Sequence, residues 1–508
     1  MVTYRQLWRA SPASWAAAGA EAGRLARHTG RDASVEVASQ VTALRAAWSG
    51  AAAQAATGRL RTVRDRLEGF AALLVALDQA LAEHAARIAE AKALLSASVA
   101  AAAGAQVTVG RDGQVDVDRT GEKPDPGDVA VARRTAAGIE AALTLAAEAD
   151  ARTARRLADL TTWCDPAKPP ARMPEPTDDP AAVRAWWAGL TGPQRRWLIL
   201  HRPGLIGSLD GVPAAARDQA NRLLLARVPA DDLADLRAWL RDARRSRAYL
   251  LRLDLDAGRA VVSLGDPDLA DHVLVHVPGT RASVDRIGVD LARADRVAAR
   301  AAEIAPGASV AAVVWLDYDA PASLPEAART GYAREAGTGL RRFVDGLRAA
   351  HDAGAPHVTV LGHSYGSLVV ATTARDHGLA ADDVVFVGSP GVGVSHVDQL
   401  PLPDGHVWST TARQDPIQLV APGPAQVARD IVRSAALPGY AGIAPVLPDE
   451  DLWHGRNPSL PQFGARIFAS ASGASVYTAH TAYWDAGNPA LDSIARITLG
   501  GGYHAAVR

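Results

Sequence analysis

Gly362-His363-Ser364-Tyr365-Gly366 carries the strongest fold signal in this chain. An apolar run containing β-branched residues, 357–361, precedes it, and a second apolar run, 367–375, follows it. This order predicts a strand, a tight turn and a helix, with Ser364 at the apex, where the helix N-terminus favours a developing negative charge. Small residues two positions either side of the serine let strand and helix pack closely. We interpret Ser364 as a nucleophile; the alternative is a structural turn that carries a serine.

The remainder of the C-terminal half alternates strands with helices. This alternation is the pattern of a mostly parallel sheet covered by helices on both faces. Asp256-Ala257-Gly258 separates the first two strands, which we expect to pair as an antiparallel hairpin at the sheet edge. Together with the serine turn, the pattern is typical of the α/β-hydrolase fold. The predicted strands span residues 249–255, 259–264, 272–277, 309–316, 357–361, 383–387, 406–411 and 465–469.

A serine hydroxyl needs a histidine base, and that histidine needs a carboxylate to orient it. In this fold the chain order is serine, acid, histidine, and the acid lies in a loop that leaves the C-terminal end of a strand. Asp415 follows the predicted strand 406–411, and Pro416 sharpens its turn. The other candidates precede their strands and lie at the wrong end (Asp382, Asp383, Asp398 and Asp404). We predict Asp415 as the acid; its alternative role is a turn-capping aspartate.

Three histidines follow Asp415: His454, His480 and His504. His504 lies four residues from the end of the chain, where chains are rarely fixed. His454 precedes the last predicted strand, in a loop rich in proline and aspartate. His480 follows that strand, where the last loop above the sheet is expected. We therefore predict His480 as the base, with His454 as the alternative and a structural histidine as the plain reading of each.

An oxyanion hole needs two backbone N–H groups aimed at the developing charge. One is expected from Tyr365, directly after the nucleophile, and the second from the loop that follows an earlier strand. The predicted strand 272–277 ends in Pro278-Gly279-Thr280, where glycine lets the backbone approach a substrate. We assign the second N–H to Gly279 or Thr280; a plain strand-to-helix turn is the alternative.

Four further residues are candidates for lining a substrate pocket. Tyr318 and Asp319 leave the strand 309–316 at the same edge of the sheet, and Tyr483 and Trp484 follow the predicted base. The alternatives are a loop for the first pair and core packing for the second. We expect His363 to pack beside the serine rather than to react. No His/Cys or His/Asp spacing predicts a metal site, and no cofactor is expected.

The first ~165 residues read as long helices. Apolar residues recur with alternating three- and four-residue steps along 60–95, the seam of a helix that packs lengthwise on a partner; His84 falls on this seam as a packing residue. An earlier helix is expected over about 12–47 and a third over about 128–160. A short hairpin is predicted from 106–109 and 114–117. The seam comprises Leu60, Val63, Leu67, Phe70, Leu74, Leu77, Leu81, His84, Ile88, Ala91 and Leu95.

Trp48-Ser49-Gly50 lies between the first two long helices, where glycine permits a reversal. A Trp-x-Gly turn that joins two helices resembles the WXG-type hairpins of type VII secretion systems. That resemblance implies a helical partner protein, bound through residues 1–165. The family's usual secretion tag, a tyrosine followed four positions on by an acid, is missing, because Tyr4 is the only tyrosine before position 249. A plain helical packing domain is the alternative.

Composition and length limit the remaining choices. With 508 residues and 48% hydrophobic residues, the chain is expected to be globular with more than one domain. A net charge of −1 argues against nucleic acid as a partner. The absence of a signal peptide or a membrane-length apolar stretch predicts a cytoplasmic protein, with type VII export as an alternative without a tag. We divide the chain into a helical domain (1–165), a proline-rich linker (166–180) and a hydrolase domain (181–508) with a helical lead-in (181–245).

The chain from Trp186 onward resembles a family of actinobacterial α/β hydrolases of unassigned substrate, often fused behind WXG-type hairpins. This resemblance implies an α/β-hydrolase fold with Ser364, Asp415 and His480 in the triad positions. The motifs that carry it are Trp186-Trp187, Ile206-Gly207-Ser208-Leu209-Asp210-Gly211-Val212-Pro213, Arg217-Asp218, Asn221-Arg222, Val277-Pro278-Gly279-Thr280, the serine turn, Gly388-Ser389-Pro390-Gly391, Asp415-Pro416 and His480-Thr481-Ala482-Tyr483-Trp484.

The sequence therefore predicts a serine hydrolase, esterase- or lipase-like, that cleaves a small-molecule or lipid carboxylic ester through an acyl-enzyme on Ser364. A different class of function is a type VII secretion-associated interaction protein whose hydrolase domain is an inert scaffold. Acyl transfer to an acceptor other than water is a third hypothesis, since it would use the same triad. The lead-in segment 210–222 is expected either to pack near the cleft or to serve as structural caps and ion pairs.

Overall fold

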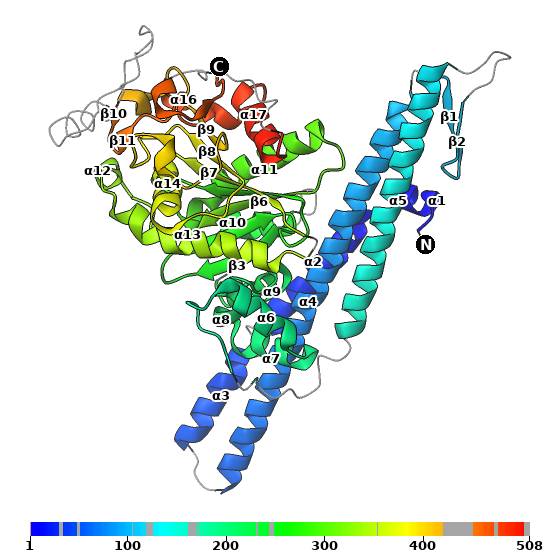
Figure 1. Cartoon of the computed structure of the whole chain (residues 1–508). Coiled ribbons are helices and arrows are strands. Elements are labelled where there is room, and N and C mark those ends of the chain that lie inside the picture. The colour runs from blue at the N-terminus through cyan, green and yellow to red at the C-terminus, as the bar shows by residue number, and fades with distance from the viewer. Residues whose placement is uncertain are drawn as a thin grey trace.

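The computed structural model describes residues 2–29, 34–47, 51–103, 105–117, 125–160, 170, 172–229, 232–242, 248–352, 354–419, 451–471 and 476–501. Two parts are visible in Figure 1: a rod of long helices from the N-terminal third, and an α/β body built around one sheet. The proline-rich linker lies largely outside the described residues, as do Trp48-Ser49-Gly50 and His504. The domain boundaries given above stay a prediction.

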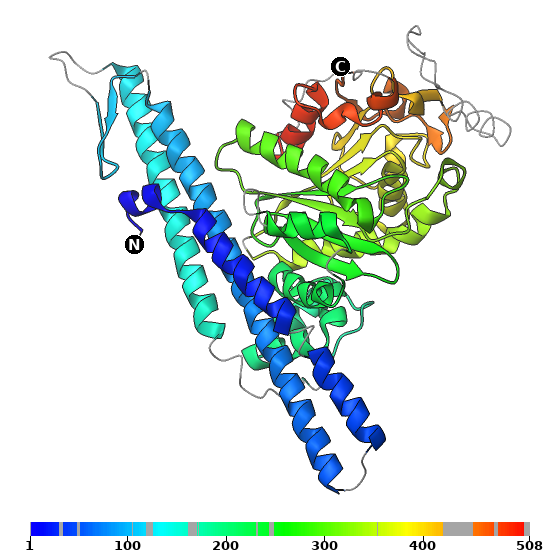
Figure 2. The ribbon, with the colours of Figure 1, turned by 180° about the vertical axis from the view of Figure 1, so that it is seen from behind.

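The rod consists of α1 (Tyr4–Arg9), α2 (Pro12–Arg27), α3 (Ser34–Ala47), α4 (Ala51–Ala101) and α5 (Pro126–Leu160). The sequence predicted one helix over 12–47, whereas the structure has α2 and α3 there. The predicted hairpin is confirmed as β1 (Val107–Val109) paired antiparallel with β2 (Val115–Val117). Figure 2 shows α2 lying along α4, with α5 on the other side of α4.

From Leu74 onward the predicted seam of α4 is buried or half-buried, and Leu74 itself, 7% exposed, shares a core with Ala22 and Ala26 of α2. Ile88, Ala91 and Leu95 share a core with Ile139 of α5 and Leu7 of α1. In the N-terminal half of α4, Val63 and Phe70 are 45% and 53% exposed. The three-four periodicity therefore predicted the buried face correctly from Leu74 onward, where α2 and then α5 pack on α4.

His84 is a packing residue, as the periodicity predicts. Its ring lies edge-on to Trp15 at 4.8 Å, and its Nδ1 is 3.2 Å from Thr153 Oγ1 on α5. Burial lowers the pKa of the His84 imidazole below its usual value. A neutral ring at this position suits a helix seam, because it requires no counter-charge.

The lead-in is helical, as predicted, and it builds its own small core. Its helices are α6 (Pro180–Gly189), α7 (Gly192–His201), α8 (Pro203–Ser208), α9 (Ala214–Ala226) and α10 (Ala234–Arg241). Val183, Trp187, Leu198 and Ile206 are buried together between α6, α7 and α8. The rod contacts this layer where the Gln79 side-chain amide on α4 donates to the Ala215 carbonyl on α9 at 2.6 Å.

One sheet organises the α/β body and confirms the predicted fold class. In the described part of the chain it has eight strands, in the order β12-β9-β8-β7-β5-β6-β4-β3. Neighbouring strands pair parallel except β3 with β4 and β4 with β6. The antiparallel hairpin expected at the sheet edge is therefore confirmed. The strands are β3 (Ala248–Asp254), β4 (Arg259–Leu264), β5 (His272–Val277), β6 (Val310–Leu316), β7 (His357–His363), β8 (Asp383–Val387), β9 (Val407–Thr410) and β12 (Arg466–Ile467).

Two hydrophobic cores lie on the two faces of this sheet. Alternation along β5 shows the division: Val273, Val275 and Val277 enter the core with α13 and α14, whereas Leu274 enters the core with α11 and α17. The parallel strands are buried on both faces and therefore read as continuous apolar runs in the sequence. The covering helices are α11 (Ile287–Ile304), α13 (Gly331–Ala350), α14 (Tyr365–His377) and α17 (Pro489–Thr498).

Short elements complete the body above the sheet. They comprise the helices α12 (Leu324–Ala327) and α16 (Val476–Ala479), the strands β10 (Asp451–Leu452) and β11 (Gly455–Arg456), and one-turn 3₁₀ helices at Val284–Arg286, Val397–Gln399, Pro416–Leu419, Pro461–Phe463 and Ala482–Trp484. No helix in the described ranges combines the length and apolar character that a membrane crossing requires.

Candidate active site

Ser364 occupies the strained turn between β7 and α14. Its backbone has φ 53° and ψ −127°, in a region that residues with a side chain rarely adopt. The Ser364 N–H donates to the Val387 carbonyl at the end of β8 at 2.9 Å, which ties the turn to the neighbouring strand. Such strain costs free energy and persists only where the surrounding structure enforces it.

The glycines of the turn leave no room for a side chain. A Cβ at Gly362 would lie 2.5 Å from Ser367 Cα, and one at Gly366 would lie 2.1 Å from the Val277 carbonyl oxygen. Backbone atoms form both obstacles, so neither can be relieved by a rotamer change. Glycine at these two positions is what allows α14 to start so close to β5 and β7.

Replacing Gly366 by alanine is therefore expected to destabilise the fold by about 1–3 kcal/mol, the usual cost of overpacking. The loss appears as a lower midpoint in urea unfolding at an unchanged slope. Gly339→Ala in α13 is the matched control, since its Cβ would meet only Trp315 ring carbons at an ordinary 3.6 Å. Equal midpoints for the two variants would contradict the steric argument.

Asp415 and His480 contact each other directly, at the C-terminal ends of the strands where the serine turn also lies. His480 Nδ1 lies 3.0 and 2.9 Å from the two carboxylate oxygens of Asp415. The Asp415 side chain is fully buried, whereas that of His480 is 25% exposed. Asp415 follows β9 and His480 follows β12, so both lie in loops after C-terminal strand ends, as predicted. The structure thus brings together two residues that are 65 positions apart.

Two more donors satisfy the Asp415 carboxylate. The Ile417 N–H donates to Oδ1 at 2.9 Å, and the Tyr483 hydroxyl donates to Oδ2 at 2.5 Å. The Tyr483 oxygen in turn accepts the Ala412 N–H at 3.0 Å. Burial and the adjacent carboxylate raise the pKa of the Tyr483 phenol well above its usual value, so the group stays a donor.

Tyr483 and Trp484 were predicted as pocket walls, and the structure packs both inside the protein. Tyr483 is 0% and Trp484 1% exposed. Tyr318 is also buried, and its hydroxyl donates to the Pro278 carbonyl at 2.6 Å. These contacts favour structural roles for all three side chains. The signal for Tyr483 was its place three residues after His480, but nothing local in the sequence pointed to Asp415 as its partner.

The His480–Asp415 pair lies beside the serine turn. Gly388 directly follows Val387, the residue that accepts the Ser364 N–H, and its backbone has φ +53°. A Cβ on Gly388 would lie 3.0 Å from Asp415 Oδ2 and 3.2 Å from His480 Nδ1. No hydrogen bond joins Ser364 Oγ to His480 within the described part of the chain, and such contacts are often long before substrate binds.

The predicted oxyanion loop also lies against the serine. A Cβ at Gly279 would lie 2.8 Å from Ser364 Cβ and 3.1 Å from the Tyr365 nitrogen, so only glycine permits this approach. Tyr365 is the first residue of α14, and an N–H at this position has no acceptor within its own helix. Beyond Thr280, the Arg281 N–H donates to the Pro321 carbonyl at 2.8 Å, which holds the loop in place.

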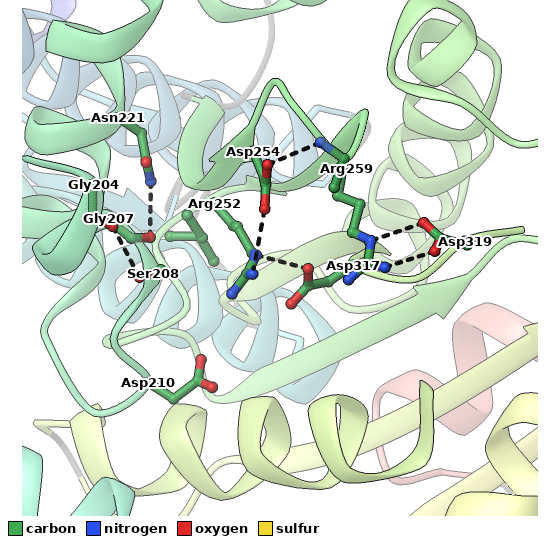
Figure 3. Close-up of polar contacts among 12 residues, drawn as sticks. Gly204, Gly207, Ser208, Asp210, Asn221, Arg252, Asp254, Arg259, Asp317 and Asp319 are labelled. Atoms are coloured by element: carbon green, nitrogen blue, oxygen red, sulfur yellow. Dashed lines mark hydrogen bonds and ion pairs between the residues drawn. The ribbon is translucent and has the colours of Figure 1, made fainter. Parts of the chain in front are cut away.

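Asp319 lies away from the serine turn. Its two carboxylate oxygens accept from the Arg259 guanidinium at 3.0 and 2.8 Å, as Figure 3 shows. Arg259 begins β4, and β6 and β5 lie between β4 and β7 in the sheet. The neighbouring Asp317 is mostly buried, and desolvation raises the pKa of its carboxyl to about 6. Asp319 therefore belongs to a charged group at the hairpin edge of the sheet.

His454, the alternative base, does not join this arrangement in the described structure. His454 is buried, and its Nε2 bonds the Ala327 carbonyl at 2.7 Å. Its ring lies edge-on to Tyr365 at 5.8 Å. His504 lies outside the described residues. Within the described ranges, no three His, Cys, Asp or Glu side chains gather as a set of metal ligands.

The lead-in motif ties α8 and α9 to the edge strand β3. Asn221 donates its amide to the carbonyls of Gly207 and Leu250 at 3.1 and 2.9 Å, and Figure 3 shows the first of these bonds. Arg217 donates to the Leu251 carbonyl and to Asp210, while Asp218 accepts the Leu250 N–H. These contacts support the structural alternative for segment 210–222, as caps and ion pairs.

Comparison with known proteins agrees with this architecture. A family model described as an alpha/beta hydrolase matches residues 254–424. The uncharacterized protein Rv2079 of Mycobacterium tuberculosis is 31% identical over 394 residues, which cover 66% of this chain and 58% of the relative. The uncharacterized protein Rv0963c of the same species is 38% identical over 191 residues, which cover 35% of this chain and 71% of the relative.

The matched regions cover neither the whole of this chain nor the whole of either relative. The chain spans less than two thirds of the length of Rv2079, so the activity and partners of such a longer protein are not carried over to this one. The match to Rv0963c covers most of that relative at 38% identity, and the sheet order, the serine turn and the alpha/beta-hydrolase model agree with it. The chain therefore belongs to this actinobacterial α/β-hydrolase family.

Proposed function

We propose that the chain is a serine hydrolase that cleaves carboxylic esters through an acyl-enzyme on Ser364. The observation that carries this proposal is the Asp415–His480 pair, at 2.9 and 3.0 Å, beside a strained serine at a helix N-terminus. The buried carboxylate accepts the Nδ1–H of His480 and so leaves Nε2 with its lone pair free to accept a proton.

The proposed reaction has two steps. Ser364 Oγ attacks the ester carbonyl carbon while His480 Nε2 takes the hydroxyl proton, and the alcohol leaves with that proton. Water then loses a proton to His480 and attacks the acyl carbon, which releases the acid and returns the proton to Ser364. The N–H of Tyr365 and one N–H of Gly279 or Thr280 would stabilise the oxyanion in both steps.

A fluorophosphonate probe and a chain-length series of nitrophenyl esters test this proposal. We expect the probe to label the wild-type chain and the label to disappear in Ser364→Ala. The ester series identifies the acyl length that the site prefers. A folded wild-type chain that takes no label and hydrolyses no ester would refute the proposal.

The second candidate function rests on the rod. Val63 and Phe70 lie on the predicted seam of α4 and are about half exposed, which is the feature that favours a helical partner through residues 1–165. This role is compatible with an active or an inert hydrolase, so the probe experiment decides only the enzyme question. Acyl transfer is tested by product analysis with added alcohols, where a new ester would replace the free acid.

Tyr483→Phe tests the support of the triad acid. The variant removes one donor to Asp415 and leaves the buried Ala412 N–H without its acceptor, so we expect a loss of roughly 1–3 kcal/mol in unfolding free energy. A less firmly held Asp415 is expected to lower kcat about 10-fold, since small displacements of catalytic groups are costly. Urea unfolding and ester turnover measure the two effects.

Tyr249→Phe is the matched control for this variant. Tyr249 is a buried tyrosine whose hydroxyl donates to the Asp266 carboxylate at 3.3 Å. It belongs to β3, the edge strand that lies four strands from β7 in the sheet order. We expect this control to lose stability but to keep its kcat. If Tyr249→Phe and Tyr483→Phe lose the same fraction of kcat, the loss reflects stability and Tyr483 has no part in holding Asp415.

A further inference from the structure

His363, the residue before the nucleophile, makes a contact that the reaction described above does not use. Its Nε2 lies 2.9 Å from the main-chain carbonyl oxygen of His480, across 117 positions of the chain. The His363 side chain is buried, with 4% of the residue exposed. The bond therefore joins the strand that ends at Ser364 directly to the backbone of the proposed base.

The chemistry of the two groups determines which of them donates. A carbonyl oxygen only accepts, so the hydrogen must lie on His363 Nε2. Burial, and then the nearby charges of Arg293, His480 and His276, lower the pKa of the His363 imidazole well below its usual value. A neutral imidazole carries one N–H, and in His363 this N–H is committed to the His480 carbonyl.

Aromatic neighbours hold the His363 ring in this orientation. The Trp484 ring stands edge-on to it at 4.9 Å and 87°, and the His480 ring lies tilted at 4.9 Å and 35°. Trp484 is in turn covered by the Arg293 guanidinium, 4.8 Å from its ring centroid. The imidazole of His363 is thus packed against two rings, and rotation of its own ring would break these contacts.

His480 is consequently held at two points. Asp415 holds its side chain through Nδ1, and His363 holds its main chain through the carbonyl. With only the first contact, the imidazole would keep its tautomer, but its Cα could shift and carry Nε2 away from Ser364. A displacement of about 1 Å at a catalytic group costs up to roughly 10²-fold in rate.

We propose that His363 is a positioning residue that holds the loop of the catalytic base against the serine turn by donating its Nε2–H to the His480 carbonyl. This inference rests on the proposed function. It assigns a role to the second residue of Gly362-His363-Ser364-Tyr365-Gly366, which acts on the reacting atoms only through His480.

Two substitutions separate the hydrogen bond from the packing. His363→Phe keeps a planar ring without a donor, whereas His363→Gln places an amide N–H at about the reach of Nε2. We expect His363→Phe to lower kcat on nitrophenyl esters about 10- to 100-fold with KM changed less than about twofold. His363→Gln should recover most of this loss, because it restores the donor.

His351→Phe is the matched control. The Nε2 of His351 likewise lies 2.9 Å from a backbone carbonyl oxygen, that of Ala270. Ala270 lies just before β5 begins, at the end of the strand away from the serine turn. We expect this variant to keep the wild-type kcat even if its stability falls. Equal kcat losses in His351→Phe and His363→Phe, or no recovery in His363→Gln, would overturn the positioning role.

A second measurement decides the matter even if His363→Phe fails to fold. Nitrogen NMR of ¹⁵N-labelled histidines should show a neutral, Nε2–H ring that does not titrate between about pH 5 and 8 and whose signal is the one lost in His363→Gln. A His363 ring that carries its only hydrogen on Nδ1 would refute the proposal.

The two proposals fail differently. If Ser364→Ala leaves ester hydrolysis intact, the proposed function is wrong. If Ser364→Ala abolishes hydrolysis and His363→Phe retains the wild-type kcat, the function stands and only the role of His363 is wrong.

Discussion

Replacing Ser364 by alanine is expected to lower kcat on a nitrophenyl ester by roughly 10⁴-fold or more. The hydroxyl is the only group that the proposed reaction has for making the acyl-enzyme, so its loss removes the step entirely. What remains is the background that the oxyanion donors provide to attack by water. Retention of more than about a tenth of the wild-type rate would refute the assignment of Ser364 as the nucleophile.

The Ser364→Ala variant should fold as the wild type does. In the described structure Ser364 bonds other residues only through its backbone N–H and carbonyl, and alanine adds no atom to the turn. We therefore expect an unchanged thermal midpoint, which separates loss of chemistry from loss of fold. Ser263→Ala is the control serine: it is buried, it bonds the Gly265 carbonyl, and it lies at the end of β4 farthest from the turn. Its kcat should stay at the wild-type value.

The sheet could be predicted closely because its strands carry strong local signals. Parallel strands buried on both faces appear as short apolar runs between turn residues, and β5 and β8 coincide with their predicted ranges. The segment predicted as one helix over 12–47 holds two helices, α2 and α3, and residues 30–33 between them lie outside the described ranges. The exposure of Val63 and Phe70 could not be foreseen, since a seam motif says nothing about how far each partner helix extends.

The candidate site likewise has features that the sequence could predict and features that it could not. Chain order and the rule that catalytic loops follow C-terminal strand ends sufficed to predict Asp415 and His480, which the structure brings within hydrogen-bonding distance. The role of Tyr483 was missed because its partner, Asp415, lies 68 positions earlier and no local pattern encodes that pairing. The sequence could not predict the bond from His363 to the His480 carbonyl for the same reason, because this bond depends on how two loops meet in the fold.

Asp415→Asn is expected to lower kcat about 10⁴-fold, the cost of a triad histidine held in the wrong tautomer. Three donors converge on the carboxylate: His480 Nδ1, the Ile417 N–H and the Tyr483 hydroxyl. Asparagine offers one oxygen where the carboxylate offers two, and its NH₂ group must face one of these donors. If the NH₂ faces His480, then Nδ1 must accept, and the ring must carry its hydrogen on Nε2, where it cannot take the Ser364 proton.

The opposite orientation of the amide does not rescue the site. In Asp415→Asn, a side-chain oxygen turned toward His480 would leave the NH₂ facing the Ile417 N–H or Tyr483, and Tyr483 already accepts from Ala412. A buried clash between donors would then cost roughly 1–3 kcal/mol in stability. Ester turnover and urea unfolding together distinguish these outcomes. Asp319→Asn, in an exposed pair with Arg259, is the control and should change neither quantity appreciably. A kcat for Asp415→Asn within about tenfold of the wild type would show that the carboxylate neither orients His480 nor stabilises its protonated form. The assignment of Ser364, Asp415 and His480 as a triad would then be refuted.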